Sequence, residues 1–172
     1  ELKHAQRVLV EDNVLEGNWL QAQTGSAVLF TVRAGQSGCH SVVNDVTFRN
    51  NVIRDTLSGF SLLGYDDGSR DGCHGESQRV AIEGNLIIKS PTTKPPHGVD
   101  VSWGPGTQDY TLRNNTFAWQ TPCRLGLFFN GKKPVGSGIV ITNNVFCQPT
   151  SGDAVRAMRT LTKFIPDPEP ID

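Results

Sequence analysis

The chain has 172 residues, a formal net charge of −1, 37% hydrophobic residues, 18 glycines and 10 prolines. A charge near zero gives no electrostatic basis for binding nucleic acid, and no apolar run reaches the length of about 18 residues that a membrane-spanning helix needs. At this length one domain is expected, and modest apolar content with many turn-forming residues suits a narrow solenoid better than a helical bundle.

A short pattern, apolar-x-apolar-x-(Asn/Asp/Gly)-Asn-x-apolar, recurs along the chain. Its five copies span Val8–Leu15, Val46–Ile53, Val80–Ile87, Tyr110–Phe117 and Ile139–Phe146. The last asparagines of the copies lie 29 to 38 residues apart, at Asn13, Asn51, Asn85, Asn115 and Asn144. Repeats of about 20–50 residues are typical of solenoids, in which each copy is one stacked unit.

Each copy predicts a strand that turns a corner. The two apolar residues before the asparagine are two positions apart, which predicts one buried strand face. The next apolar residue lies two positions after the asparagine, which is five positions after the previous apolar residue. Because this spacing is odd, one residue must turn the chain for the apolar side chains to stay inward. Asparagine tolerates the left-handed conformation that such a corner needs. Asparagines stacked at one height can also hydrogen-bond in a ladder.

A second strand follows each copy. These strands are expected at Ala27–Thr31, Gly59–Leu63, Gly98–Ser102, Gly126–Asn130 and, more weakly, Ala154–Met158. The alternation predicts two inward columns, one of Val28, Phe60, Val99, Leu127 and Val155, the other of Phe30, Leu62, Val101, Phe129 and Ala157.

This order of strand, asparagine corner, strand and loop resembles the right-handed parallel β-helix of the pectate-lyase-like superfamily. More narrowly, it is similar to secreted bacterial β-helix repeat proteins. The resemblance covers about residues 5–158 and implies an all-β solenoid of about five rungs. We expect a single domain over 1–172, with a proline-rich extended tail at 159–172. Because a solenoid needs caps and no amphipathic cap helix is seen, we expect a fragment of a longer solenoid whose ends could stack on one another.

Four cysteines pair by position in this layout. Cys39 and Cys73 fall in the same outer loop of adjacent rungs, and Cys123 and Cys147 in the other variable turn. Rungs stack about 4.8 Å apart, within disulfide reach, so two disulfides and an oxidising, extracytoplasmic compartment are expected. The alternative is a zinc site of two Cys-His dipeptides, Cys39-His40 and Cys73-His74, although zinc ligands are usually spaced further apart.

Acidic residues near the outward face of the second strands suggest one kind of chemistry. Asp100, with Asp66 or Asp67 on the neighbouring rung, could supply the two carboxyls that glycoside hydrolysis requires. A lyase would add a calcium ion to such acids, and otherwise no cofactor is expected. Asp-Asp-Gly-Ser is also an ordinary turn sequence, so a solvated, non-catalytic role stays open.

Binding a sugar without cleaving it requires no catalytic acids. Aromatic rings stack on sugar rings while polar groups fix their orientation. The candidate ligand-binding residues, expected at turn or outward positions, are Arg33, Tyr65, Trp103, Trp119 and Asn130. Three functions therefore remain: a secreted module that binds a polysaccharide or oligosaccharide, part of a polysaccharide lyase or hydrolase, and a structural or assembly solenoid.

Overall fold

The computed structural model describes residues 1–18, 26–32, 41–64, 77–89, 98–119, 125–129 and 136–146. This part of the chain is all-β, as expected from the sequence, and every strand pair in it is parallel. Over these ranges no helix is long and apolar enough to cross a membrane.

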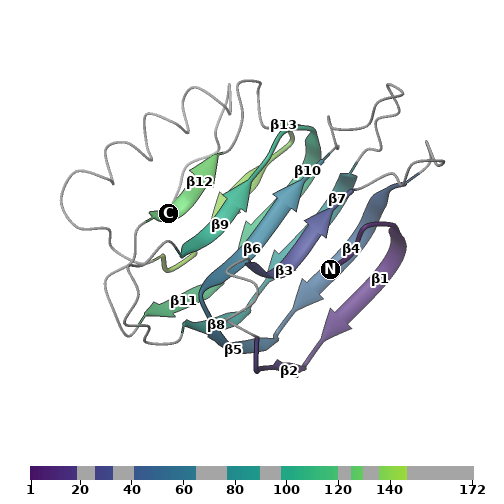
Figure 1. Cartoon of the computed structure of the whole chain (residues 1–172). Helices are drawn as coiled ribbons and strands as arrows, with labels where there is room; N and C mark the ends of the chain where they lie inside the picture. Colours follow the sequence, from purple (N-terminus) through teal and green to yellow (C-terminus); the bar gives the residue numbers. More distant parts are fainter. Residues whose placement is uncertain are drawn as a thin grey trace.

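The strands form three sheets (Figure 1). Sheet I contains β1 (Ala5–Glu11), β4 (Val43–Arg49), β7 (Ser77–Glu83), β10 (Thr107–Arg113), β13 (Gly136–Ser137) and β14 (Val140–Thr142). Sheet II contains β2 (Val14–Leu15), β5 (Val52–Thr56), β8 (Leu86–Lys89) and β11 (Thr116–Trp119). Sheet III contains β3 (Ser26–Thr31), β6 (Ser58–Leu63), β9 (Val99–Trp103) and β12 (Leu125–Phe129).

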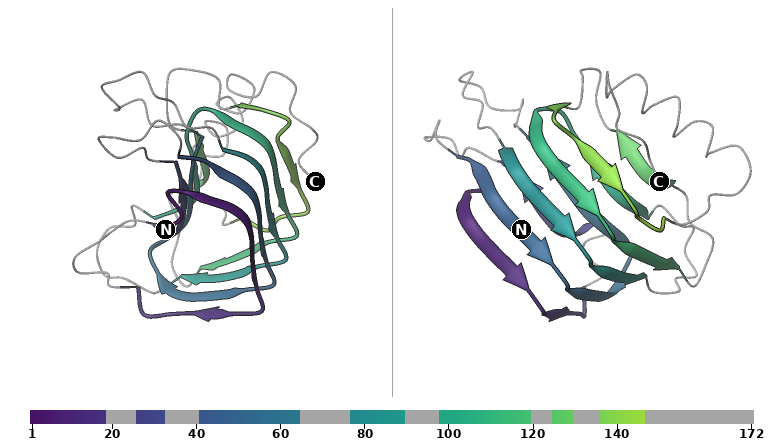
Figure 2. Two further views of the ribbon diagram at one scale, coloured as in Figure 1. Left: turned by 90° about the vertical axis from the view of Figure 1, so that its right-hand side faces the viewer. Right: turned by 180° about the vertical axis from the view of Figure 1, so that it is seen from behind.

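Successive strands of each sheet come from successive repeats, so the chain winds through the three sheets in turn. Seen along the stack, the strands of a sheet lie behind one another and the sheets form three sides of a solenoid-like body (Figure 2, left). Val8, Val46, Val80 and Tyr110, all at the same place in the repeat, are direct cross-strand partners. The sequence repeat therefore fixes the register of sheet I.

The core lies between the three sheets and consists of columns of apolar side chains. Phe48 packs edge-on against Phe30 and Phe60, with ring centroids 5.9 and 5.7 Å apart, and Phe60 packs in the same way against Phe117. All four rings are at most 3% exposed. Edge-to-face contacts of this kind add about 0.5–1.5 kcal/mol each beyond the burial of area.

The corner between sheets I and II is held by asparagine side chains. The Oδ1 of Asn85 accepts hydrogen bonds from the backbone N–H (2.9 Å) and the Nδ2 (3.1 Å) of Asn51. Asn115 Oδ1 accepts the same pair from Asn85, at 3.0 and 2.9 Å. Asn13 and Asn144 extend these bonds to the adjacent repeats. The left-handed residue of each corner is the one before this asparagine, and these residues are Asp12, Asn50, Gly84, Asn114 and Asn143, with φ between 51° and 63°.

Sheet III differs from the expected register in one repeat. Phe60 pairs with Val101 and Leu62 with Trp103, whereas the sequence pattern aligned them with Val99 and Val101. The shift of two residues preserves the inward face, because the side-chain period of a strand is two. It follows the segment between β8 and β9, residues 90–98, where the sequence offers no fixed spacing to count.

A substitution at Gly64 tests how closely the backbones of adjacent coils approach one another beside sheet III. A Cβ at this position would lie 1.8 Å from the carbonyl carbon of Gly106, which is backbone and cannot rotate away. We expect Gly64→Ala to lower the free energy of unfolding by about 1–3 kcal/mol or more. Gly104→Ala is the matched control, because its closest contact is the flexible Leu63 Cδ1. Equal losses in urea denaturation would contradict this close approach.

Candidate functional site

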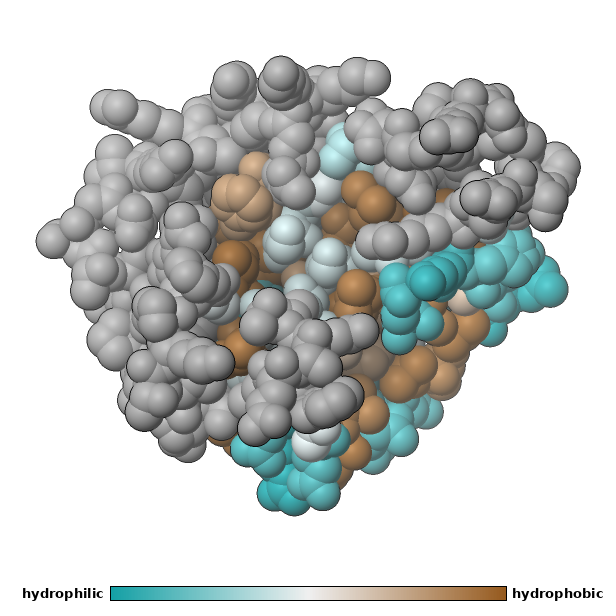
Figure 3. All heavy atoms as spheres, in the orientation of Figure 1, coloured by the Kyte–Doolittle hydropathy of each residue, from teal (hydrophilic) through white to brown (hydrophobic). Residues whose placement is uncertain are grey.

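The outward face of sheet III carries a row of uncharged side chains. Leu29, Ser61, Ser102 and Phe128 are successive cross-strand partners. Phe128 is 40% exposed, and the other three are half-buried. The described residues visible at the centre of this side are pale and brown in the space-filling view (Figure 3). We call these four residues the sheet III row. It presents two hydroxyls and one aromatic ring in line, about 4.8 Å apart from strand to strand.

Trp103 does not lie on this face, and the expected outward position is wrong. Its side chain has no exposed surface, and its Nε1–H donates to Thr107 Oγ1 at 2.8 Å. The indole packs against Tyr110 and Phe129, with ring centroids 5.7 and 6.1 Å away. Trp103 points inward because it pairs with the buried Leu62. It is therefore a core residue and cannot stack on a sugar in this arrangement.

Asp100 is also buried, contrary to its expected outward position. Its Oδ1 lies 2.6 Å from Lys89 Nζ, and neither side chain has exposed surface. Asp100 precedes Val101 as Gly59 precedes Phe60 in the adjacent strand. A Cβ on Gly59 would point at the Phe117 ring, 3.0 Å away. Gly59 and Asp100 lie at the corner where the chain enters sheet III, and two consecutive side chains face inward there. The in-and-out alternation counted from the middle of the strand therefore fails at this corner.

The environment of Lys89 is unusual for a lysine. Burial lowers its pKa from 10.5 to about 8, and the neighbouring Asp100 carboxylate offsets only part of this effect. Removing an ammonium from water costs several kcal/mol unless it is well paired. This pair was not predicted from the sequence, because a lysine and an aspartate eleven residues apart are ordinary on any surface.

Other predicted site residues lie outside the described part of the chain. These are Arg33, Tyr65, Asp66, Asp67 and Asn130, together with Cys39, His40, Cys73, His74, Cys123 and Cys147. Trp119 ends β11, but its side chain is also outside the described set. Over the described ranges no three His, Cys, Asp or Glu side chains cluster closely enough to hold a metal ion. The calcium and zinc alternatives rest mainly on the undescribed loops.

Sheet I differs from sheet III because its outward face carries regular charge. One row, two residues before each of the first four corner asparagines, alternates in sign through Glu11, Arg49, Glu83 and Arg113. Arg49 Nη2 lies 2.6 Å from Glu11 Oε2, and Arg113 Nε lies 2.9 Å from Glu83 Oε1. Exposed pairs such as these contribute about 0–1 kcal/mol each, but opposite signs favour the observed pairing of neighbouring strands.

A second charged row on sheet I alternates in the opposite phase. It contains Arg7, Asp45, Arg79 and Asp109, all with left-handed backbone, φ 51–55°. Arg79 Nε donates to Asp45 Oδ1 at 2.6 Å, and this hydrogen bond lowers the pKa of Asp45. Both rows were missed in the sequence, although the charges recur at constant offsets from the corner asparagines. The two charged rows make the outward face of sheet I highly charged, whereas the sheet III row is uncharged.

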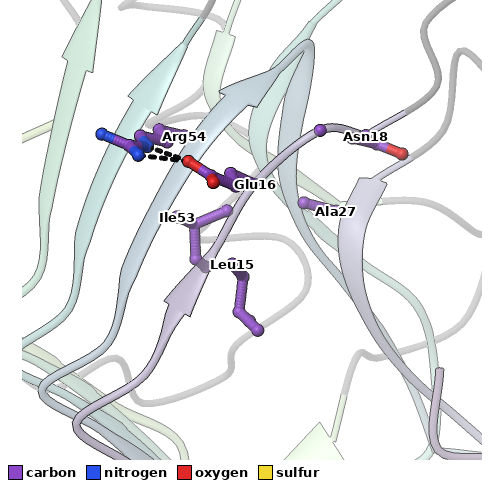
Figure 4. Close-up of a pocket in the computed structure, with 7 residues that line it drawn as sticks. Leu15, Glu16, Asn18, Ala27, Ile53 and Arg54 are labelled. Carbon is purple, nitrogen blue, oxygen red and sulfur yellow. Dashed lines mark hydrogen bonds and ion pairs between the residues drawn. The ribbon is translucent and has the colours of Figure 1, made fainter.

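A small pocket opens at the first repeat (Figure 4). Leu15, Ala27 and Ile53 line its apolar side, and the Glu16–Arg54 ion pair lies at its edge. Its volume of about 160 Å³ is below the roughly 300–1,000 Å³ typical of small-molecule sites. It is therefore not a site for a sugar chain.

Comparisons with protein-family models, with curated proteins and with solved structures find no match to this chain. The function is therefore inferred from the geometry of the described residues.

Proposed function

We propose that this chain is a secreted right-handed parallel β-helix of the pectate-lyase-like type, with about five rungs and an asparagine ladder, that binds a polysaccharide or oligosaccharide. Parallel sheets formed by successive repeats support the architecture, and the bonds between asparagines from Asn13 to Asn144 support the ladder. Right-handed crossover is the rule for parallel strands in one sheet.

The sheet III row is the observation that carries the binding proposal. Sugar recognition combines an aromatic face with hydroxyl groups that fix orientation. Phe128 offers the ring, and Ser61 and Ser102 offer hydroxyls in register with it. No charged side chain interrupts this row, so a neutral sugar would not have to displace a bound counter-charge.

Binding is proposed ahead of cleavage because of Asp100. A general acid or nucleophile must reach the substrate, and the Asp100 carboxyl has no exposed surface. A polysaccharide lyase or hydrolase would need Asp66 and Asp67 to supply the acids without Asp100. An assay of product formation on the same polysaccharides separates the two functions, since cleavage would favour the enzyme.

The binding proposal is tested by Phe128→Ala. Against a panel of plant and microbial polysaccharides, we expect the best ligand to bind about tenfold more weakly, which corresponds to about 1.4 kcal/mol. Leu9→Ala is the matched control, because Leu9 is 54% exposed but lies on sheet I. Binding that is absent from every polysaccharide, or equally weakened in both variants, would overturn the proposal. Affinity electrophoresis followed by calorimetry supplies the measurement.

Secretion is tested through the cysteines. We propose the pairs Cys39–Cys73 and Cys123–Cys147, which would contribute about 3–4 kcal/mol each by constraining the unfolded chain. The melting temperature should then fall sharply under reductant and remain unchanged with chelator. Free thiols in the folded protein, or melting that follows the chelator, would instead support the zinc alternative at Cys39, His40, Cys73 and His74.

An assembly role is favoured by a different observation. In the described chain β1 and β2 form one end of sheets I and II, and their outward Leu9 and Val14 are 54% and 59% exposed. Unpaired strand edges accept further strands, so end-to-end stacking is the second candidate. Sedimentation velocity tests it: Leu9→Lys should abolish any concentration-dependent association, and a parent chain that stays monomeric would remove this candidate.

A further inference from the structure

The buried Lys89–Asp100 pair joins the end of one sheet to the start of another. Lys89 is the last residue of β8 in sheet II, and Asp100 is the second residue of β9 in sheet III. Their Nζ and Oδ1 atoms are 2.6 Å apart, and the carboxyl carbon is one covalent bond beyond that oxygen. An amine and a carboxyl are thus held in contact across the base of the segment between the two strands.

The neighbouring coils hold this contact tightly. Thr56 and Trp119 are the cross-strand partners of Lys89. Asp100 lies between two glycines, because Gly59 and Gly126 precede the partners of Val101 in the adjacent strands. A Cβ on Gly59 would come within 2.3 Å of the Asp100 carbonyl oxygen. The backbone of Asp100 therefore packs directly against Gly59, which holds it in place beside the amine.

The setting also favours uncharged partners. Burial destabilises both ions, and proton transfer from ammonium to carboxylate removes both charges at once. Burial also lowers the pKa of Lys89 to about 8, which favours its neutral amine relative to that of an exposed lysine. A neutral amine is a nucleophile, and a protonated carboxyl can lose its hydroxyl as water.

We propose that Lys89 and Asp100 condense into an intramolecular side-chain amide. The ammonium first gives a proton to the carboxylate. The Nζ lone pair then attacks Asp100 Cγ, the new C–N bond forms, the C–OH bond breaks, and the hydroxyl leaves with an amine proton as one water. No oxidant, reductant or further reactant is required. Holding the groups in contact replaces a bimolecular encounter, and exclusion of bulk water protects the product from hydrolysis.

The amide would close the base of the β8-to-β9 segment covalently. In the preceding coil the equivalent corner is closed by a hydrogen bond, in which Thr56 Oγ1 donates to the Ser58 carbonyl at 2.8 Å. Lys89 occupies the column of Thr56, but the chain between its two strands is much longer in its own coil. A covalent tie there is independent of the carbohydrate-binding proposal, and neither depends on the other.

Mass spectrometry of the purified full chain tests the amide. After denaturation and disulfide reduction, the chain should be lighter than its sequence by the mass of one water. Trypsin should fail to cleave after Lys89, which leaves a peptide 80–113. That peptide should give no fragment ions from within the closed ring, 89–100. A chain of full sequence mass, or a tryptic peptide that ends at a free Lys89, would overturn the proposal.

Two variants distinguish the amide from other losses of water. Asp67-Gly68 and Asp71-Gly72 are sequences that can also lose water by forming succinimides. Lys89→Arg should restore the full mass, whereas a deficit that persists in this variant would assign the loss to a succinimide and refute the amide. Asp100→Asn should reach the same amide by losing one ammonia in place of water, and an unchanged mass in this variant would count against it.

Discussion

Asn85→Ala is expected to lower the free energy of unfolding by about 3–5 kcal/mol. The side chain is 2% exposed and makes four hydrogen bonds. Its Oδ1 accepts from Asn51, and its Nδ2 donates to Asn115 Oδ1 and to the carbonyl of Phe48. Each lost bond contributes about 0.5–1.5 kcal/mol, and a buried group left without a partner costs about 1–3 kcal/mol. Alanine keeps the fold's backbone bonds but leaves the Asn51 N–H without its acceptor.

Asn13→Ala is the matched control for this prediction. Asn13 occupies the same corner, but it is exposed and has a described coil on one side only. Its Nδ2 donates to Glu11 O and Asn51 Oδ1, and water can replace both partners, so the expected loss is about 1 kcal/mol or less. Urea denaturation followed by circular dichroism measures both values. Similar losses at the two positions would show that the corner bonds add little to stability.

The corner and the core could be predicted from the sequence because both repeat. The asparagine spacing located the turn, and the apolar positions at fixed offsets identified Phe48, Ile82 and Leu112 as inward, where all three are at most 3% exposed. The left-handed residue proved to be the variable Asn, Asp or Gly before the corner asparagine. This follows from the same pattern, because those three residue types are the ones that adopt positive φ most readily.

The site was harder to predict, because it depends on places where the repeat is interrupted. Trp103 was placed just beyond the expected strand Gly98–Ser102, because the long segment between β8 and β9 shifts the register by two residues and carries the strand on to Trp103, which no local pattern reports. Asp100 was assigned outward by strand alternation, which fails where a strand begins at a corner. The aligned Ala27, Gly59 and Gly126 did hold a signal. Small residues in three of four coils indicate a column that faces a crowded interior.

The buried carboxylate of Asp100, at the corner between β8 and β9, gives a second prediction with a comparable change in the free energy of unfolding. We expect Lys89→Met to be less stable to unfolding than Lys89→Met/Asp100→Ala by about 3–5 kcal/mol. Methionine keeps much of the lysine's length but leaves the Asp100 carboxylate buried without its cation. Alanine removes that charge and matches Ala27, the equivalent residue of the first coil.

Neither of these variants contains the Lys89 amine, so their comparison does not depend on the proposed amide. Lys89→Met should also become more stable on acidification, because protonation neutralises the buried carboxylate that has lost the Lys89 cation, while the double variant should lack that response. Urea denaturation at several pH values measures both effects. Equal stabilities of the two variants would mean that water reaches Asp100 once Lys89 is removed. If instead the double variant is the more stable, the aspartate is costly to the fold without its partner. A lysine in contact with it would then offset that cost, either as an ion pair or as an amide.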